Sequence, residues 1–243
     1  MKALVVGGSS GIGLSIVLNF LSRNEYDRVF VIDKVAFPDE YRTGKIADIL
    51  CDLSYGDYSC LDYVDDIKAL YITAGFGHLG LFQEFPEAYI QDSFSVNTIA
   101  PILIIRHFYD KLLSKDDFYC GVMVSIAGRL SSPLFSVYSA TKAALSKFIE
   151  AINVELDVQG SRNRVLEISP GSMKGTGFTG GVSKPEMTAD LAKEIIQRAQ
   201  AHEELFIPQF DNVFKDVIER YQADAHRFGV DSYWYKKKRI EGQ

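Results

Sequence analysis

The segment KALVVGGSSGIG, residues 2–13, decides how this chain is interpreted. An apolar run, Lys2–Val6, leads into the glycine-rich segment Gly7–Gly13, and apolar residues at helical spacing follow over Gly11–Arg23. Glycines let the backbone turn tightly and approach a diphosphate, whose charge is stabilised by the amides of a helix N-terminus. The glycine spacing is not G-x-G-x-x-G, so the segment taken alone fits a dinucleotide site and an ordinary tight turn about equally well.

Further apolar runs are short and continuous, which is typical of strands buried on both faces of a parallel sheet. They are Val29–Ile32, Ala69–Thr73, Gly121–Val124 and Val165–Ile168. Helical spacing is found between them, over Tyr89–Leu113 and Tyr138–Val158. This alternation predicts a doubly wound parallel α/β sheet of Rossmann type, with helices on both faces.

The chain contains no internal repeat or low-complexity linker, so residues 1–243 are predicted to form a single domain. Residues 171–185 are rich in Gly, Ser and Thr and predict a mobile loop over a substrate site. Residues 186–243 form a C-terminal extension, in which we expect a helix over Glu186–Glu204, an edge strand over Leu205–Ile207 and a helix over Asn212–Phe228.

Composition excludes several classes of protein. A net charge of −6 disfavours nucleic-acid binding, and no apolar run approaches the roughly 20 residues of a membrane helix. The cysteines, Cys51, Cys60 and Cys120, lack metal-ligand spacing, and the four histidines are scattered, so we expect free thiols and no metal. The apolar strand at the start leaves no room for a signal peptide, and a cytoplasmic location is expected.

Asp33 follows the second apolar run, 20 residues after Gly13. A carboxylate at this place can accept hydrogen bonds from an adenosine ribose and repels a 2′-phosphate. NAD(H) is therefore preferred as cofactor, although Lys34 can partly offset the repulsion and leaves NADP(H) open. The plainer alternative is that Asp33 is a strand-end turn residue.

Tyr138 and Lys142 are spaced i, i+4 at the start of the predicted long helix. The ammonium on the same helix face can lower the pKa of the phenol and make it a usable acid and base. The pair alone is weak evidence because such spacings are common on solvated helices. Ser125 strengthens it, since this hydroxyl follows an apolar strand at the sheet edge where ligands of open α/β folds bind.

These motifs in this order resemble the short-chain dehydrogenase/reductase family, in its short single-domain branch, from about Lys2 to Thr176. Ser125 and Tyr138 are 13 residues apart, which is the interval usual in the family. The residues that carry the resemblance are Gly7, Gly11 and Gly13 of the glycine motif, Asp33, Asp52 after the third strand, Ala74 and Gly75, and the tetrad Asn97, Ser125, Tyr138 and Lys142.

The resemblance implies a dinucleotide-binding oxidoreductase that transfers a hydride between NAD(H) and a carbonyl or secondary alcohol. Tyr138 would exchange the proton, Ser125 would hydrogen-bond the same oxygen, Lys142 would bind the nicotinamide ribose and Asn97 would anchor a water molecule. The implied cofactor contacts are Gly7, Ser9, Ser10, Gly11, Ile12, Gly13, Asp33, Asp52, Leu53, Ala74, Gly75, Asn97, Tyr138, Lys142, Pro170, Gly171, Met173 and Thr176.

The sequence departs from the family pattern at two places. Val6 takes the place of the usual Thr, and Ile72-Thr73 replace two asparagines whose side chains tie neighbouring strands, so we expect a weaker tie there. The family's Pro-Gly-x-x-x-Thr is longer by one residue, with Gly175 in the Thr position and Thr176 next.

The segments expected to face the substrate are partly apolar, through Leu130, Leu134, Phe135, Met173 and Phe178, which fits a moderately hydrophobic small-molecule ketone or alcohol. Arg129 is expected to be an exposed loop residue, and the basic run Lys236–Arg239 a solvated tail or subunit contact. The family also implies a homodimer or homotetramer formed through Ile90–Leu113 and Tyr138–Val158. The rival interpretations are a non-catalytic NAD(H)-binding sensor or regulator and a structural subunit.

Overall fold

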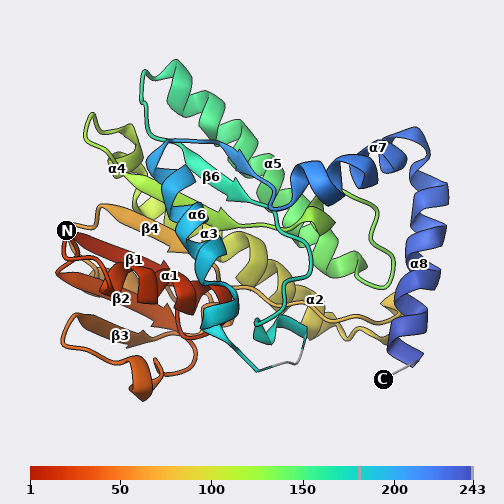
Figure 1. Ribbon diagram of the computed structural model, residues 1–243, viewed down its shortest axis with the longest axis horizontal. Helices are drawn as coiled ribbons and strands as arrows, with labels where there is room; N and C mark the ends of the chain where they lie inside the picture. The colour runs from red at the N-terminus through yellow and green to blue at the C-terminus, as the bar shows by residue number, and fades with distance from the viewer. Residues whose placement is uncertain (180–181, 242–243) are drawn as a thin grey trace.

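The computed structural model describes residues 1–179 and 182–241 and contains a seven-stranded parallel sheet (Figure 1). The strand order is β3-β2-β1-β4-β5-β6-β7, and every neighbouring pair runs parallel. The strands are β1 Lys2–Val6, β2 Arg28–Asp33, β3 Ile46–Leu50, β4 Ala69–Ile72, β5 Tyr119–Met123, β6 Val165–Ile168 and β7 Leu205–Phe206. The predicted doubly wound sheet is confirmed.

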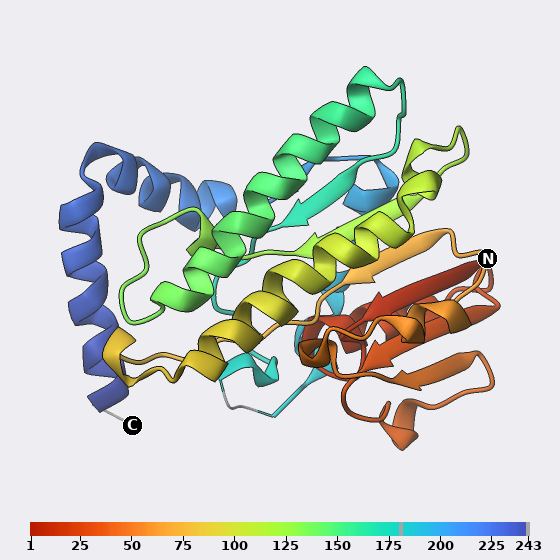
Figure 2. The same ribbon diagram turned by 180° about the vertical axis from the view of Figure 1, so that it is seen from behind.

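Helices cover both faces of this sheet, as predicted (Figures 1 and 2). One face carries α1 Gly11–Leu21 and α6 Ala189–Gln200, and the other carries α2 Glu87–Phe94, α3 Ala100–His107, α4 Tyr109–Leu113 and α5 Ser136–Val158. Successive side chains of a strand point to opposite faces of the sheet, so alternate strand residues belong to two separate hydrophobic cores. Ala3 and Val5 of β1 pack with α1 and α6, whereas Leu4 and Val6 pack with α3 and α5.

The predicted helix Tyr89–Leu113 is correct in place but is not one regular helix. A π-helical turn over Ser95–Ile99 joins α2 to α3, and Asn97 lies inside it. Such turns are rare, and they are frequent at functional sites because they change the direction of a side chain within a helix.

The C-terminal extension differs from the prediction. The expected helix Asn212–Phe228 is interrupted at Asp224, whose backbone is extended, so that α7 ends at Ala223 and α8 begins at Ala225. Asp224 Oδ1 accepts a hydrogen bond from the Arg227 N–H at 2.9 Å, as an N-cap residue does. Helix α7 therefore covers Lys215–Ala223, and α8 covers Ala225–Glu241.

In the basic run predicted as a solvated tail or subunit contact, Lys236 belongs to α8 and packs on the chain itself. Helix α8 lies beside the loop that joins β5 to α5 (Figure 2). Lys236 Nζ donates hydrogen bonds to Ser132 Oγ at 2.6 Å and to the Pro133 carbonyl at 3.1 Å. Lys236 is partly buried because its side chain lies against Ser132 and Pro133 of this loop.

Three other observations concern the described residues. Cys51, Cys60 and Cys120 are free thiols, as predicted. Within residues 1–179 and 182–241, no helix is both long and apolar enough to span a bilayer, and no three His, Cys, Asp or Glu side chains meet as metal ligands would. Gly180 and Gly181 of the predicted mobile loop 171–185, and Gly242 and Gln243 of the extension, lie outside the described residues.

We predict that Gly13→Ala destabilises the fold strongly. A Cβ at Gly13 would overlap the Gly7 carbonyl oxygen and Thr73 Oγ1, so α1 would have to move away from β1 and β4. The expected loss in free energy of unfolding is about 3 kcal/mol or more, measured by urea denaturation. The matched control is Gly44→Ala, where a Cβ meets nothing within 4 Å and the effect should be small. Equal stabilities of the two variants would contradict this account.

Candidate active site

Tyr138 and Lys142 lie in the first turns of α5, on one face of the helix. The Lys142 side chain is 2% exposed, and its Nζ donates a hydrogen bond to the Met123 carbonyl at 2.9 Å, at the carboxyl end of β5. Burial disfavours the ammonium and lowers the pKa of Lys142 to about 7. Its Nζ is 5.8 Å from the centroid of the Tyr138 ring, so the two groups share one buried site.

Burial of both groups acts against the predicted lowering of the Tyr138 pKa by Lys142. Burial raises the pKa of the Tyr138 phenol to about 12, and a hydrogen bond with Ser125 acts in the opposite direction. The physical reason is that desolvation disfavours both charged forms, so the phenolate is destabilised and the lysine carries less charge at neutral pH.

Ser125 begins the short 3₁₀ turn Ile126–Gly128 at the edge of the sheet. Its Oγ accepts a hydrogen bond from the Ala127 N–H at 3.1 Å, which fixes the hydroxyl at the start of the turn. The backbone on either side of Ser125 is hydrogen-bonded to the end of β6 and the residues after it. The Val124 N–H donates to the Ile168 carbonyl, and the Ile126 N–H donates to the Pro170 carbonyl. Ser125 is thereby held within hydrogen-bonding reach of Tyr138.

Asn97 is fully buried and points from its π-helical turn toward the loop after β4. Its Oδ1 accepts from the Phe76 N–H at 3.0 Å, and its Nδ2 donates to the Phe76 carbonyl at 2.8 Å and to Thr141 Oγ1 at 3.2 Å. A Cβ built on Gly75 would lie 3.0 Å from Asn97 Oδ1 and 3.3 Å from Lys142 Nζ. Asn97 and Lys142 therefore meet beside Gly75, and Lys142 in turn lies near Tyr138 and its neighbour Ser125. The water-anchoring role of Asn97 stays a prediction.

The glycine-rich segment forms a tight turn between β1 and α1. Gly7 has a φ of +84°, which other residues rarely adopt, and Gly13 approaches the Gly7 carbonyl too closely for any side chain. At the start of α1, the Gly11 N–H donates to Ser183 Oγ at 2.7 Å. This N–H at the start of a helix donates to an oxygen atom of another segment. A diphosphate is bound by N–H donors of the same kind.

The loop after β6 is packed on this turn. A Cβ built on Gly11 would lie 3.6 Å from Thr176 Cβ, so Thr176 is placed beside the glycine motif despite the extra residue in the family pattern. Thr176 Oγ1 donates to the Met173 carbonyl at 3.0 Å, which folds this part of the loop on itself.

Asp33 and Asp52 lie at the carboxyl ends of β2 and β3. Asp33 Oδ2 accepts from the Ser9 N–H at 3.0 Å, and Oδ1 accepts from the Val35 N–H at 3.3 Å. Asp33 therefore accepts one hydrogen bond within its own turn, from Val35, and one from the glycine-rich segment, which it orients. Asp52 Oδ1 accepts from the Ser54 N–H and Oγ, and these bonds lower the pKa of Asp52, with a smaller contribution from the charge of Lys34.

The other predicted cofactor residues follow the carboxyl ends of the strands. Leu53 is buried beside Asp52, and the Ala74 N–H donates to the Val6 carbonyl at 3.0 Å. Pro170 and Gly171 follow β6 directly. Ser9 and Ser10 belong to the turn between β1 and α1, and Ile12 lies in the first turn of α1. Met173 borders a cavity of about 630 Å³ between α6 and the segment after β7.

The expectation of a weak tie between β1 and β4 is wrong. Thr73 Oγ1 donates to the Val6 carbonyl at 3.1 Å and to the Gly7 carbonyl at 3.0 Å. A hydroxyl therefore performs the cross-strand bonding that the asparagines perform in the family pattern. Since Thr73 also packs against Gly13, it fixes the glycine-rich segment on the sheet.

Aromatic rings cover the Tyr138 phenol, which is only 6% exposed. The Phe135 ring stacks on it with centroids 4.4 Å apart, and the Phe178 ring lies tilted at 5.2 Å. Sequence reasoning missed Phe214, whose ring packs against the backbone of Gly171. No local pattern signals this contact, because it joins the segment after β7 to the turn after β6.

Arg129, predicted to be an exposed loop residue, is half-buried and forms an ion pair with Glu167. Its guanidinium contacts Glu167 Oε1 through Nη2 at 2.8 Å and through Nε at 3.0 Å. Glu167 lies inside β6 and is almost fully buried, so the guanidinium is held to balance its charge.

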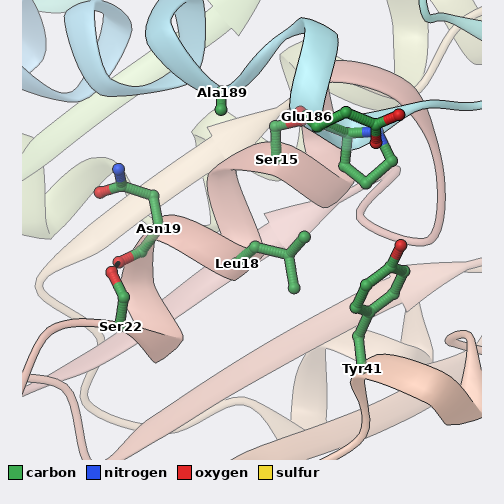
Figure 3. A pocket seen from close by; sticks show the side chains of 8 residues that line it. Ser15, Leu18, Asn19, Ser22, Tyr41, Glu186 and Ala189 are labelled. Carbon is green, nitrogen blue, oxygen red and sulfur yellow. Dashed lines mark hydrogen bonds between the residues drawn. The ribbon is translucent and has the colours of Figure 1, made fainter.

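A cavity of about 380 Å³ lies on the outer side of α1 and is separate from the tetrad (Figure 3). Its lining residues are Ser15, Leu18, Asn19, Ser22, Tyr41, Pro185, Glu186 and Ala189. At its upper edge, Ser15 Oγ lies 2.9 Å from the Pro185 carbonyl and 2.6 Å from Thr188 Oγ1. These contacts anchor the end of the loop after β6 on α1.

A family model described as short chain dehydrogenase matches residues 58–187, which is more than half of the chain. Together with the parallel sheet and the assembled tetrad, this match defines a dinucleotide-fold oxidoreductase. The chain belongs to the short-chain dehydrogenase/reductase family.

Similar proteins include an uncharacterized oxidoreductase of Saccharomyces cerevisiae, 28% identical over 186 residues, with 73% of this chain and 56% of that protein covered. A probable short-chain type dehydrogenase/reductase of Helicobacter pylori is 29% identical over 180 residues, with 71% and 65% covered. The matched part of the chain thus spans less than two thirds of the length of these two relatives.

Two solved structures show the same fold. One is a 4-hydroxyisoleucine dehydrogenase complexed with NADH and succinate, with a TM-score of 0.69, 21% identity, and 84% of this chain and 96% of that chain covered. The other is a short-chain dehydrogenase from Sphingobium yanoikuyae in complex with NADPH, with a TM-score of 0.72, 18% identity, and 92% and 95% covered.

We predict that Lys142→Met stabilises the protein most at acidic pH. The folded-state pKa of about 7 lies below the ordinary value of 10.5, so the unfolded state binds more protons between these values and wild-type stability rises with pH there. The stability gained by the variant is therefore greatest below pH 7, by a few kcal/mol, and falls as the pH rises. Urea denaturation across this range measures the difference.

The control for this experiment is Lys147→Met, on the same helix but solvent-exposed. Its stability difference from the wild type should change little with pH. A difference for Lys142→Met that is equally flat would contradict the burial of an ammonium at this position.

Proposed function

We propose that this chain is an oxidoreductase that transfers a hydride between NAD(H) and a carbonyl or secondary alcohol, with Tyr138 as general acid and base. The observation that carries this proposal is the convergence of Ser125, Tyr138, Lys142 and Asn97 at the carboxyl edge of the sheet. When bound, the nicotinamide accepts or supplies the hydride.

The roles of the side chains follow from their chemistry. With its pKa raised to about 12, the Tyr138 phenol keeps its proton at neutral pH and can donate it to a carbonyl oxygen. Ser125 hydrogen-bonds that oxygen and stabilises the negative charge that develops on it. Lys142 binds the nicotinamide ribose, and Asn97 holds the loop after β4 against α5 through Phe76 and Thr141.

The cofactor site fits a dinucleotide. Gly7, Gly11 and Gly13 leave room for close backbone approach, and the Gly11 N–H is directed at an oxygen acceptor from the loop after β6. Asp33 at the end of β2 favours NAD(H), because a carboxylate beside a ribose repels a 2′-phosphate. Lys34 follows it and can partly offset this repulsion, and solved structures of the same fold are complexed with NADH or with NADPH.

The substrate is proposed to be a small, moderately hydrophobic ketone or alcohol. The support is the aromatic cover of the site, in which Phe135 and Phe178 contact Tyr138 and Phe214 packs on Gly171. Rings of this kind favour apolar groups beside the reacting carbon. If the protein turns over only strongly charged substrates in a panel of carbonyl compounds and alcohols, this substrate class is contradicted.

We further propose a homodimer or homotetramer in the cytoplasm. The support for oligomerisation is a set of exposed apolar side chains on the outer face of α3, α5 and the π-helical turn: Ile99, Leu103, Val154 and Val158. A monomeric mass by light scattering at micromolar concentration would contradict this assembly.

The free cysteines support a reducing compartment, and recovery of the protein with membranes on cell fractionation would contradict a cytoplasmic location.

Tyr138→Phe is predicted to lower the rate of NADH-dependent carbonyl reduction by about 10²–10⁴-fold, because the proton donor is lost while the ring stays. The measurement is NADH consumption across a panel of hydrophobic ketones. The control variant is Tyr63→Phe, whose side chain is exposed and belongs to the turn Ser59–Tyr63 that precedes β4. If NADH binds and neither the wild type nor the variant turns over any carbonyl, the non-catalytic sensor becomes the better interpretation.

Asp33→Asn is predicted to shift the cofactor preference toward NADPH. The amide keeps the size and the acceptor oxygen that bonds Ser9 but removes the charge that repels a 2′-phosphate. We expect the ratio of kcat/KM for NADPH and NADH to rise about tenfold or more. An unchanged ratio would show that Asp33 serves only the turn.

A further inference from the structure

Glu167 is a buried carboxylate in the middle of β6, with 3% of its surface exposed. Its side chain lies on the face of the sheet that α5 covers, since its neighbours Leu166 and Ile168 pack on the opposite face with α6. Both oxygens are hydrogen-bonded. Oε1 accepts from Arg129 Nη2 at 2.8 Å, Arg129 Nε at 3.0 Å and Ser169 Oγ at 2.7 Å, and Oε2 accepts from Ser146 Oγ at 2.9 Å.

The first of these partners, Arg129, connects Glu167 to the turn that begins at Ser125. Arg129 directly follows the 3₁₀ turn Ile126–Gly128, whose first residue comes after Ser125. The same turn touches α5, because a Cβ built on Gly128 would lie 2.7 Å from the Lys142 carbonyl carbon. The position of Arg129 therefore fixes how the Ser125 turn sits against the helix that carries Tyr138.

The other two partners, Ser146 and Ser169, connect Glu167 to α5 and to the turn after β6. Ser146 comes one helical turn after Lys142 and two turns after Tyr138, so the three side chains share one face of α5. Ser169 directly precedes Pro170 and Gly171, which are among the predicted cofactor contacts. A single carboxylate thus joins the serine turn, the catalytic face of α5 and the turn after β6.

We propose that Glu167 is a positioning residue that holds Ser125, Tyr138 and the turn after β6 in the relative arrangement needed for proton and hydride transfer. The inference rests on the proposed function for its catalytic consequence. A carboxylate suits this task because its two oxygens accept bonds from several directions, and burial keeps those bonds free of competition from water. The Arg129 guanidinium balances the buried charge.

The test compares Glu167→Ala with Asn153→Ala. Asn153 is equally buried and also joins α5 to β6, through bonds of 2.9 Å to both the N–H and the carbonyl of Val165, but it lies near the other end of α5. Both variants lose stability. For Glu167→Ala we expect kcat per folded molecule to fall about tenfold or more, with the Kd for NADH within about twofold of wild type. For Asn153→Ala we expect kcat to stay near the wild-type value.

Glu167→Gln serves as the conservative rescue, since an amide of the same size can accept from Arg129 and donate to Ser146. It should recover most of the lost kcat. If Glu167→Ala does not fold, Ser146→Ala cuts only the link to α5 and should still lower kcat about threefold without weakening NADH binding. Equal kcat losses in the Glu167 and Asn153 variants, or no loss in the Glu167 and Ser146 variants, would overturn the proposal.

Amide hydrogen exchange separates this proposal from the proposed function. Exchange at residues 126–128 should rise in Glu167→Ala and stay unchanged in Asn153→Ala. If the wild type turns over no carbonyl, the proposed function fails, and the exchange data alone decide whether Glu167 holds the turn. Unchanged exchange at residues 126–128 in Glu167→Ala would overturn the positioning role even in an active enzyme.

Discussion

The whole arrangement depends on one close backbone contact, where α1 begins against the ends of β1 and β4. Gly13 lies against the Gly7 carbonyl and the Thr73 hydroxyl, with no room for a Cβ. That contact sets the direction of α1 and brings its first amides to the carboxyl edge of the sheet. Because the ends of parallel strands meet at this edge, Asp33, Asp52, Ser125 and the turn after β6 gather around the same place.

Chemistry at this edge depends on burial. Desolvation raises the pKa of Tyr138 and lowers that of Lys142, so both groups favour their neutral forms. Such a pair functions only if its geometry is held by other parts of the protein. Asn97 holds the loop after β4 through Phe76, and Glu167 joins the turn after Ser125 to α5. Polar contacts thereby surround Tyr138, which exchanges the proton in the proposed reaction, and its neighbour Lys142.

Most of the sheet could be predicted because its strands are continuous apolar runs, and the tetrad could be predicted from residue order. Local patterns did not reveal the long-range contacts. The strand β3, Ile46–Leu50, carries Asp48 in its middle and lacks an uninterrupted apolar run. Arg129 looked exposed because its partner Glu167 lies on another strand. The break at Asp224 does have a local signal, because Asp is a common N-cap residue.

The central claim, that the chain transfers a hydride and does not merely bind the dinucleotide, is tested most directly with NADH deuterated at the reactive nicotinamide carbon. The protein is incubated with hydrophobic ketones, and the alcohol products are analysed by mass spectrometry. The account predicts one deuterium on the carbinol carbon of at least one product. Tight binding of NADH with no deuterated alcohol from any ketone would contradict it and would favour a non-catalytic sensor.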